Sequence, residues 1–184
     1  MAKQLPGISD HLRAFIEAQH LFFVGTAAPD GRVNVSPKGL DSLRVLGPNR
    51  VAWLNVTGSG NETAAHLRLS PRMTLMFCAL QGPPLILRLY GQARAVHSAD
   101  PDWADWITLF APLPGARQVF VMDVDLVQTS CGMAVPLMEF AQDREDLNTW
   151  ASGQGPAGLR EYQAQKNAVS IDGFPTGLPG TVDT

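Results

Sequence analysis

Strand-like segments joined by strong turn signals restrict the fold of this chain more than any other feature of its sequence. Residues 21–27 are mostly apolar and run into Pro29-Asp30-Gly31, after which residues 32–36 alternate between polar and apolar side chains. Pro presets one turn dihedral, Asp bonds to its own backbone and Gly accepts positive φ, so the three together favour a tight turn. The pattern therefore predicts a β-hairpin.

The same features predict a second hairpin and three more strands. The segments are residues 43–46 and 51–56, which flank Gly47-Pro48-Asn49-Arg50 and form the hairpin, and residues 72–80, 85–97 and 119–127. Gly91 interrupts the longest of these alternating runs. A glycine inside a strand indicates a bulge or a close approach of another backbone, so we expect one of the two at this position.

Helices are predicted to be short and to lie between or after the strands. They are expected after a cap at Ser9 or Asp10, over residues 62–69 and 100–111, and near the C-terminus over residues 137–150 and 156–168. They do not alternate with strands in a βαβ rhythm, which disfavours a doubly wound sheet. The 17 Gly and 14 Pro also fit many short elements joined by turns. We therefore expect a mainly β chain whose antiparallel sheet curls into a barrel with flanking helices.

The strand pattern ends before the C-terminal quarter of the chain. We expect a barrel domain over residues 1–138, followed over residues 139–184 by a helical extension and a flexible tail. The apolar residues of the extension are expected to pack on the barrel or on a partner subunit; they are Leu147, Trp150, Leu159 and Tyr162. The chain after Pro175 is expected to be mobile, because it is rich in Gly, Pro and Thr.

Charge and hydropathy exclude several classes of function. The net charge is −3 and no run of Lys or Arg occurs, so the electrostatic signature of a nucleic-acid-binding protein is missing. No apolar stretch approaches the roughly 18 residues that a membrane span needs, and the first residues lack the apolar core of a signal peptide. Cys78 and Cys131 have no metal-type spacing, and no metal site is predicted. These features are typical of a cytoplasmic protein with reduced thiols.

The segment from Thr57 to Leu67 carries the most chemical information. A glycine-rich loop leads directly into a predicted helix, so unpaired N–H groups and the positive end of the helix dipole meet there and suit a phosphate. Ser59, Asn61 and Thr63 add side-chain donors. An ordinary helix capped by Asn61 is the structural alternative. The loop matches neither the dinucleotide fingerprint nor a P-loop, and Glu62 would repel a phosphate unless its side chain turns away.

A phosphate at this loop also needs a cation. Lys38 is a candidate, because Ser36-Pro37-Lys38-Gly39 places it in a constrained turn at the end of a strand. Arg88 is a second candidate and should project from the strand face opposite Leu87 and Leu89. For both residues, a solvated surface charge remains the alternative.

Taken together, these segments resemble the pyridoxamine 5′-phosphate oxidase-like, FMN-binding split-barrel family. The resemblance covers about residues 10–130. It rests on the order and spacing of these stretches: residues 22–26, Asp30-Gly31, residues 33–39, residues 51–54 leading to residues 58–65, and residues 71–77 leading to residues 87–93. It implies an antiparallel split β-barrel that holds FMN in a groove between the two subunits of a homodimer.

The resemblance also implies which residues contact the cofactor. The flavin phosphate would lie against the turn of Ser36 and Lys38 and against the start of the helix at Glu62, where Ser59, Asn61 and Thr63 lie; Arg88 is the further candidate. The chain departs from the true oxidases, which carry a Ser-Arg-Lys cluster where Asn61, Glu62 and Thr63 stand here. It also lacks their C-terminal Arg and Trp signature, so its small-molecule substrate is not identified by the resemblance.

Three functions follow as hypotheses. The first is a flavin-dependent oxidoreductase, in which the cofactor carries the chemistry and the protein positions it. The second is a non-catalytic flavin- or haem-binding protein on the same barrel. The third is a barrel without a cofactor, since a fold does not determine a function. No catalytic residue is predicted: His66 is the best-placed histidine, and Cys131 has no neighbouring base or resolving cysteine.

Overall fold

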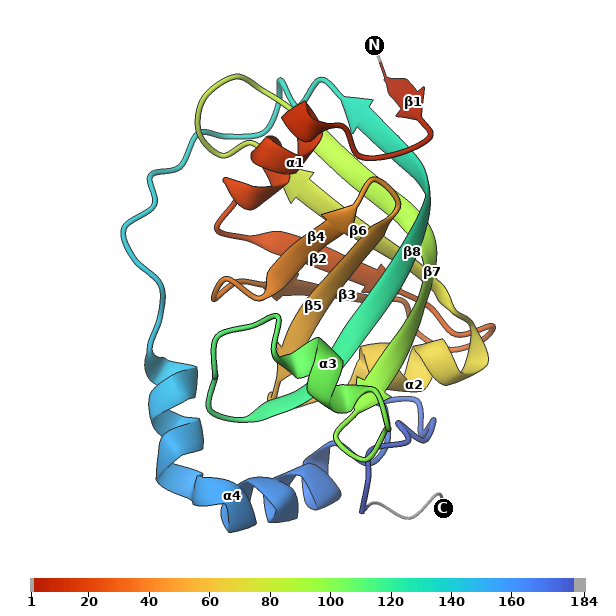
Figure 1. Ribbon diagram of the computed structural model, residues 1–184, viewed down its shortest axis with the longest axis vertical. Coiled ribbons are helices and arrows are strands. Elements are labelled where there is room, and N and C mark those ends of the chain that lie inside the picture. Colours follow the sequence, from red (N-terminus) through yellow and green to blue (C-terminus); the bar gives the residue numbers. More distant parts are fainter. Residues whose placement is uncertain (1, 181–184) are drawn as a thin grey trace.

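A computed structural model describes residues 2–180, and within them it shows one eight-stranded antiparallel sheet with helices around it (Figure 1). The strands are β1 (Lys3–Leu5), β2 (Phe22–Thr26), β3 (Asn34–Lys38), β4 (Leu43–Gly47), β5 (Arg50–Val56), β6 (Arg72–Cys78), β7 (Ile86–His97) and β8 (Ala116–Ser130). The helices are α1 (Asp10–Glu17), α2 (Glu62–Leu69), α3 (Trp103–Ile107) and α4 (Asp146–Lys166). None of these helices is long and apolar enough to cross a membrane.

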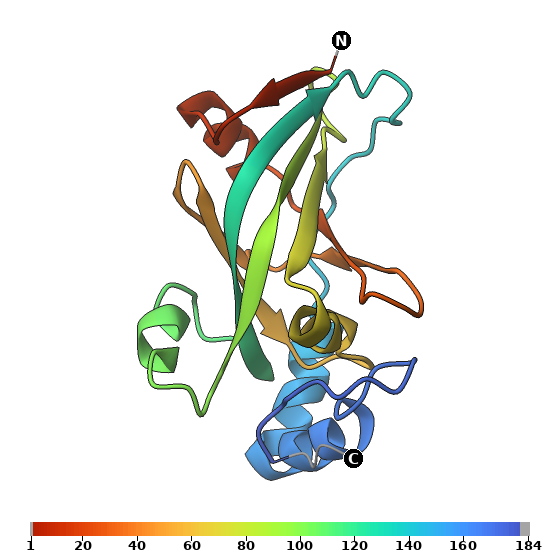
Figure 2. The ribbon, with the colours of Figure 1, turned by 90° about the vertical axis from the view of Figure 1, so that its right-hand side faces the viewer.

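The strand order shows how the sheet curls. It runs β3-β2-β6-β7-β8-β5-β4, and β1 pairs with β8 in addition. β7 and β8 are long and strongly bent, and they carry the sheet around from one edge to the other (Figure 2). The edge strands β3 and β4 do not pair with each other, so the barrel is open between them. This confirms the expected antiparallel split barrel with flanking helices.

Both predicted hairpins are present. β2 pairs with β3 from Phe22 opposite Lys38 to Thr26 opposite Asn34, and β4 pairs with β5. The predicted irregularity at Gly91 is a register shift between β7 and β8. A side chain on Gly91 would begin 1.9 Å from the carbonyl oxygen of Asp123, so the bulge depends on the missing Cβ.

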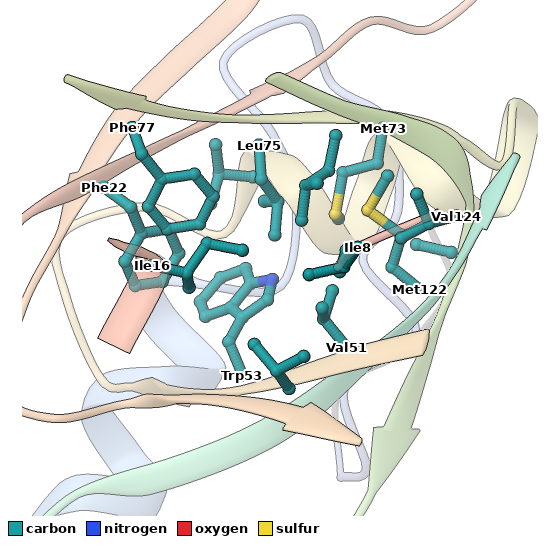
Figure 3. Packing of buried hydrophobic residues seen from close by; sticks show 14 of the residues in the cluster. Ile8, Ile16, Phe22, Val51, Trp53, Met73, Leu75, Phe77, Met122 and Val124 are labelled. Carbon is teal, nitrogen blue, oxygen red and sulfur yellow. The ribbon is translucent and has the colours of Figure 1, made fainter. Parts of the chain in front are cut away.

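The barrel interior is apolar (Figure 3). Trp53 lies at its centre, fully buried, with the Phe120 ring stacked on it at 4.6 Å between centroids and Phe22 edge-on to it. The alternation of β6 places Met73, Leu75 and Phe77 on this interior face, as its sequence pattern predicts. A smaller apolar cluster between β5, β7 and β8 packs under α3 on the outside of the sheet.

The helix ends follow the sequence closely in the first half of the chain. Ser9 caps α1 by accepting a hydrogen bond from the backbone N–H of Leu12. α2 begins at Glu62 and ends just before Pro71, as expected.

The second half of the chain differs from the prediction in three places. α3 covers only residues 103–107 of the predicted 100–111, and β8 begins at Ala116, three residues before the predicted start. Residues 137–145 are not helical, and α4 starts at Asp146. Leu137 and Met138 are 77% and 53% exposed there, and a short helix without a buried face is marginal in water. Gly155, at φ 63°, divides α4 just before Pro156.

The C-terminal segment is packed further than its composition suggests. Thr176 is fully buried and Leu178 is 4% exposed, and the Thr176 backbone N–H donates to the carbonyl of Ala168. Thr176 and Leu178 therefore pack against the rest of the chain, and the mobility expected after Pro175 stays a prediction. The last four residues of that predicted tail lie outside the described residues.

Candidate functional site

A polar cavity of about 280 Å³ lies at the opening of the barrel. It is bounded by β3, by the end of β5 and the loop into α2, and by the start of β8. Its lining residues are Asn34, Ser36, Lys38, Asn55, Val56, Gly58, Ser59, Gly60, Asn61, Glu62, Thr63 and Arg117. Nine of these twelve residues have polar or charged side chains, so the cavity suits a charged or strongly hydrogen-bonding ligand.

β3 supplies one wall of this cavity through its alternation. Asn34, Ser36 and Lys38 line the cavity, whereas Val35 and Pro37 between them are exposed on the opposite face. β3 is an edge strand, and within the part of the chain that the structure describes only β2 pairs with it.

Asn61 stands at the cap position of α2 but makes no capping hydrogen bond. Its side chain is 3% exposed, and neither its Nδ2 nor its Oδ1 has a hydrogen-bond partner among residues 2–180. Leaving a buried amide unpaired typically destabilises a protein by about 1–3 kcal/mol. The capped-helix alternative for Asn61 therefore does not describe the structure, and the free amide indicates a site for a polar ligand.

Lys38 extends into the cavity with its ammonium group over a core aromatic ring. Its Nζ lies 5.2 Å from the ring centroid of Trp53, a cation–π contact. Burial, and to a smaller extent the charge of Arg117, lower the pKa of Lys38 from 10.5 to about 8. No carboxylate in the described part of the chain forms an ion pair with it. Lys38 therefore lines the cavity as a poorly solvated cation that lacks a counterion.

Arg117 on β8 is a second buried cation in the cavity, and the sequence analysis missed it. It is 5% exposed, and burial lowers its pKa to about 10. Its Nη1 and Nη2 both donate to the Gly60 carbonyl at 3.2 Å, and Nη1 also donates to Oδ1 of Asn167 at 2.5 Å. Its Nε has no partner among the residues described. The three hydrogen bonds go to neutral acceptors and Nε has no acceptor, so the charge of the guanidinium is uncompensated.

Glu62, the one carboxylate of the cavity lining, is held by another segment. Its Oε1 and Oε2 accept the backbone N–H of Ile171 at 3.1 and 3.2 Å. From its position in the sequence, this carboxylate is expected to repel a phosphate unless the side chain turns away. The contact with Ile171 engages both of its oxygens with the C-terminal segment.

A hydrogen-bond chain behind the cavity fixes two of its lining residues. Asn34 Nδ2 donates to Oγ1 of Thr63 at 3.3 Å and to Oγ1 of Thr26 at 3.2 Å, and Thr26 Oγ1 lies 3.1 Å from Nδ1 of His66. His66 is 1% exposed and does not line the cavity. The histidine considered from the sequence thus lies in the packing behind the site.

Five of the six predicted cofactor-binding residues meet at this one cavity. They are Ser36, Lys38, Ser59, Asn61 and Thr63. Arg88 does not line it: it extends from β7 between the buried Leu87 and Leu89, on the outward face of the strand, and donates to Oγ of Ser130 at 3.3 Å. Cys131, also considered above, is an exposed thiol that follows β8.

The arrangement can bind a multiply charged anion. Two cations without acidic partners, a free amide and the start of α2 converge on one cavity, which is how proteins hold a phosphate group. An uncompensated buried charge is unfavourable, and an anion between Lys38 and Arg117 would neutralise both.

Comparisons with known proteins agree with the fold. Two solved structures share it: HupZ of Group A Streptococcus, with a TM-score of 0.51, 19% identity and coverage of 65% of this chain and 91% of that one, and a protein of Clostridium acetobutylicum related to general stress protein 26 of B. subtilis (pyridoxinephosphate oxidase family), with a TM-score of 0.51, 16% identity and coverage of 64% and 84%.

Sequence comparison shows the family of the chain as well as its fold. The pyridoxamine 5′-phosphate oxidase family protein ustO of Aspergillus flavus is 40% identical over 186 residues, which cover 91% of this chain and 75% of that protein. The sequence profile described as pyridoxamine 5′-phosphate oxidase matches residues 8–131, which hold β2 to β8 and every residue of the cavity lining. The chain belongs to the pyridoxamine 5′-phosphate oxidase family.

Proposed function

We propose that the chain is an FMN-binding flavoprotein that holds the cofactor's phosphate in the cavity between β3, α2 and β8. The observation that carries this proposal is the pair of buried cations, Lys38 and Arg117, next to the unpartnered amide of Asn61. A phosphate dianion needs both countercharge and several donors, and this cavity offers both.

Two cations on other strands can take the role of the oxidase-type Ser-Arg-Lys cluster, which this chain lacks. With Asn61, Glu62 and Thr63 in its place, the loop itself has no cation. Lys38 on β3 and Arg117 on β8 bring the two positive charges from other strands. The helix start adds about half a positive charge, which alone would not balance a dianion.

A flavin held in this way would supply hydride or single-electron transfer, which supports an oxidoreductase acting on a small molecule. The chain's own residues then bind the phosphate, fix the cofactor's position and keep water from the two cations. The haem alternative has less support, because the described lining residues include no His, Cys or Met that could bind iron axially.

One spectrum followed by one reduction tests the proposal. The purified protein, loaded with FMN and dialysed, is expected to retain the yellow absorbance of a flavin, and to bleach when a reduced nicotinamide is added anaerobically. Retained colour without bleaching would support the non-catalytic alternative. A protein that keeps no flavin would contradict the proposal.

FMN affinity is expected to fall as the pH rises above about 8. Lys38 has a pKa of about 8 in the free protein, and a bound phosphate must raise it, so binding takes up a proton between these two values. The affinity should be level from pH 7 to 8 and then fall by up to about tenfold per pH unit. Fluorescence titration with FMN from pH 7 to 9.5 measures it.

Riboflavin gives the control for this pH effect, because it has the same ring without the phosphate. Its affinity should change little over the range in which FMN weakens. Equal slopes for the two ligands would mean that Lys38 does not face the phosphate.

We also propose that the protein is a homodimer. Val33, which precedes β3, and Val35 on that strand are 72% and 66% exposed, and the outer edge of β3 has no strand partner among the residues described. Exposed apolar edge strands are usually covered in native proteins. A second copy of the chain is the occupant that the family resemblance implies.

Light scattering after size-exclusion chromatography is expected to give twice the mass of the chain, and Val35→Lys is expected to give the monomer. Leu109→Lys serves as the control: Leu109 is 38% exposed and follows α3, so it also offers an exposed apolar side chain but is not part of the β3 edge. A monomeric wild type, or equal dissociation by both variants, would contradict the proposal.

A further inference from the structure

The end of α4 and the segment that follows it contact the loop that lines the proposed phosphate cavity. Gln163 donates to Oγ1 of Thr57 at 2.7 Å, and the Asn167 side chain donates through Nδ2 to the Gly58 carbonyl at 3.0 Å. Asn167 is fully buried, and its own carbonyl accepts a hydrogen bond from Oγ1 of Thr176 at 2.7 Å. The end of the chain thus holds the loop that forms one wall of the cavity.

Asn167 is also the side chain that contacts the Arg117 guanidinium most closely. Its Oδ1 accepts from Nη1 at 2.5 Å, while its Nδ2 holds Gly58. One carboxamide therefore fixes both the cation and the loop, which line the same cavity. Neither contact adds a charge.

The neutrality of this partner is the unusual feature. A guanidinium that is 5% exposed normally pairs with a carboxylate, because an uncompensated charge in the interior is unfavourable. An Asp at position 167 would have nearly the same shape and would provide that carboxylate. An Asn there orients Arg117 and leaves its charge available to a ligand.

We infer that Asn167 is a positioning residue that keeps Arg117 both oriented and uncompensated for the anionic group of the ligand. The inference rests on the proposed function, since it takes the anion to be a phosphate. It assigns a binding role to the C-terminal segment, which lies beyond the region matched by the family profile.

Two variants at this position separate charge from geometry. Asn167→Asp puts a carboxylate against Arg117 and cancels its charge, and should weaken FMN by about tenfold or more. Asn167→Ala keeps the charge and loses the orientation, so FMN should weaken only a few-fold. Stability should follow the other order: both variants lose the donor to the Gly58 carbonyl, but only the alanine variant also removes the acceptor of Arg117 Nη1, so it should melt at the lower temperature.

Isothermal titration of FMN and of riboflavin against wild type and both variants, with a thermal melt of each, tests the inference. Riboflavin affinity should stay within about twofold throughout. Equal loss of FMN in both variants, or parallel loss of riboflavin, would show that Asn167 only supports the fold and would overturn the inference.

The design separates failure of the inference from failure of the proposed function. Wild-type protein that binds FMN no better than riboflavin would refute the phosphate site itself. Wild type that prefers FMN, together with an aspartate variant that keeps that preference, would refute only the role of Asn167. If the aspartate variant does not fold, the alanine variant decides: a loss of FMN alone supports the inference, and a loss of both ligands contradicts it.

Discussion

Replacing Lys38 with methionine is expected to weaken FMN binding by about ten- to a hundredfold. The ammonium group lies in the cavity without an acidic partner, and a charge-assisted hydrogen bond to phosphate contributes roughly 1.5–3 kcal/mol. Methionine keeps an unbranched apolar chain over the Trp53 ring, so packing is largely preserved. Stability should be unchanged or higher, because burial already disfavours the charged form of Lys38.

Two controls isolate the phosphate contact. Riboflavin should bind the Lys38 variant as it binds wild type. Arg88→Met removes the other cation that the sequence suggested, and because Arg88 does not line the cavity, FMN affinity should stay within about twofold. Titration by flavin fluorescence measures all of these values. Equal weakening of FMN and riboflavin by Lys38→Met would place the phosphate elsewhere, and a large effect of Arg88→Met would assign the contact to the outer face.

Local sequence patterns were sufficient to predict those parts of the site whose backbone geometry depends on neighbouring residues in the chain. The loop from Thr57 to Asn61 and the start of α2 at Glu62 follow from glycines, a cap position and a terminating proline, all within a few residues. The alternation predicted for residues 32–36 places Ser36 on the cavity face, as found, whereas Lys38 reaches that face as the last residue of β3 and not from the turn that we predicted. Features set by neighbouring residues need no knowledge of distant contacts.

Arg117 could not be found in this way. The predicted strand began at Val119, so Arg117 fell in a presumed loop, whereas β8 begins at Ala116 and takes Arg117 inward. The contacts that hold it inside come from Gly60 and Asn167, which are 57 and 50 residues away along the chain. The only local feature of Arg117 is its position just before a strongly apolar strand. Exposed arginines often have the same position, so this feature does not indicate burial.

Arg88 shows the opposite limitation. Its side-chain direction, opposite to Leu87 and Leu89, was predicted and is found. What the alternation does not reveal is which face of the strand turns toward the cavity, because that depends on how the whole sheet curls. A correct local direction therefore led to a candidate that the fold places outside the cavity.

Gly91 connects a local sequence pattern to the closure of the barrel, and its replacement should strongly destabilise the protein. In Gly91→Ala the new Cβ would lie 1.9 Å from the Asp123 carbonyl oxygen and 3.0 Å from Cα of Val124. The obstructing atoms are backbone and cannot rotate away, so β7 and β8 would have to separate where their register shifts. We expect a loss of about 3 kcal/mol or more in the free energy of unfolding.

Gly25→Ala is the matched control for this change, since it also adds one methyl group inside a strand. Its Cβ would meet the nearest atoms of Thr74 at 3.8 Å, an ordinary van der Waals contact, so the loss should stay below about 1 kcal/mol. Urea denaturation of both variants measures the difference. Because β7 and β8 carry the sheet from the β3 edge to the β5 side of the cavity, Gly91→Ala should also lower FMN and riboflavin affinity together. Equal stability of the two alanine variants would mean that the bulge tolerates a side chain and that the 1.9 Å approach relaxes without disturbing the barrel.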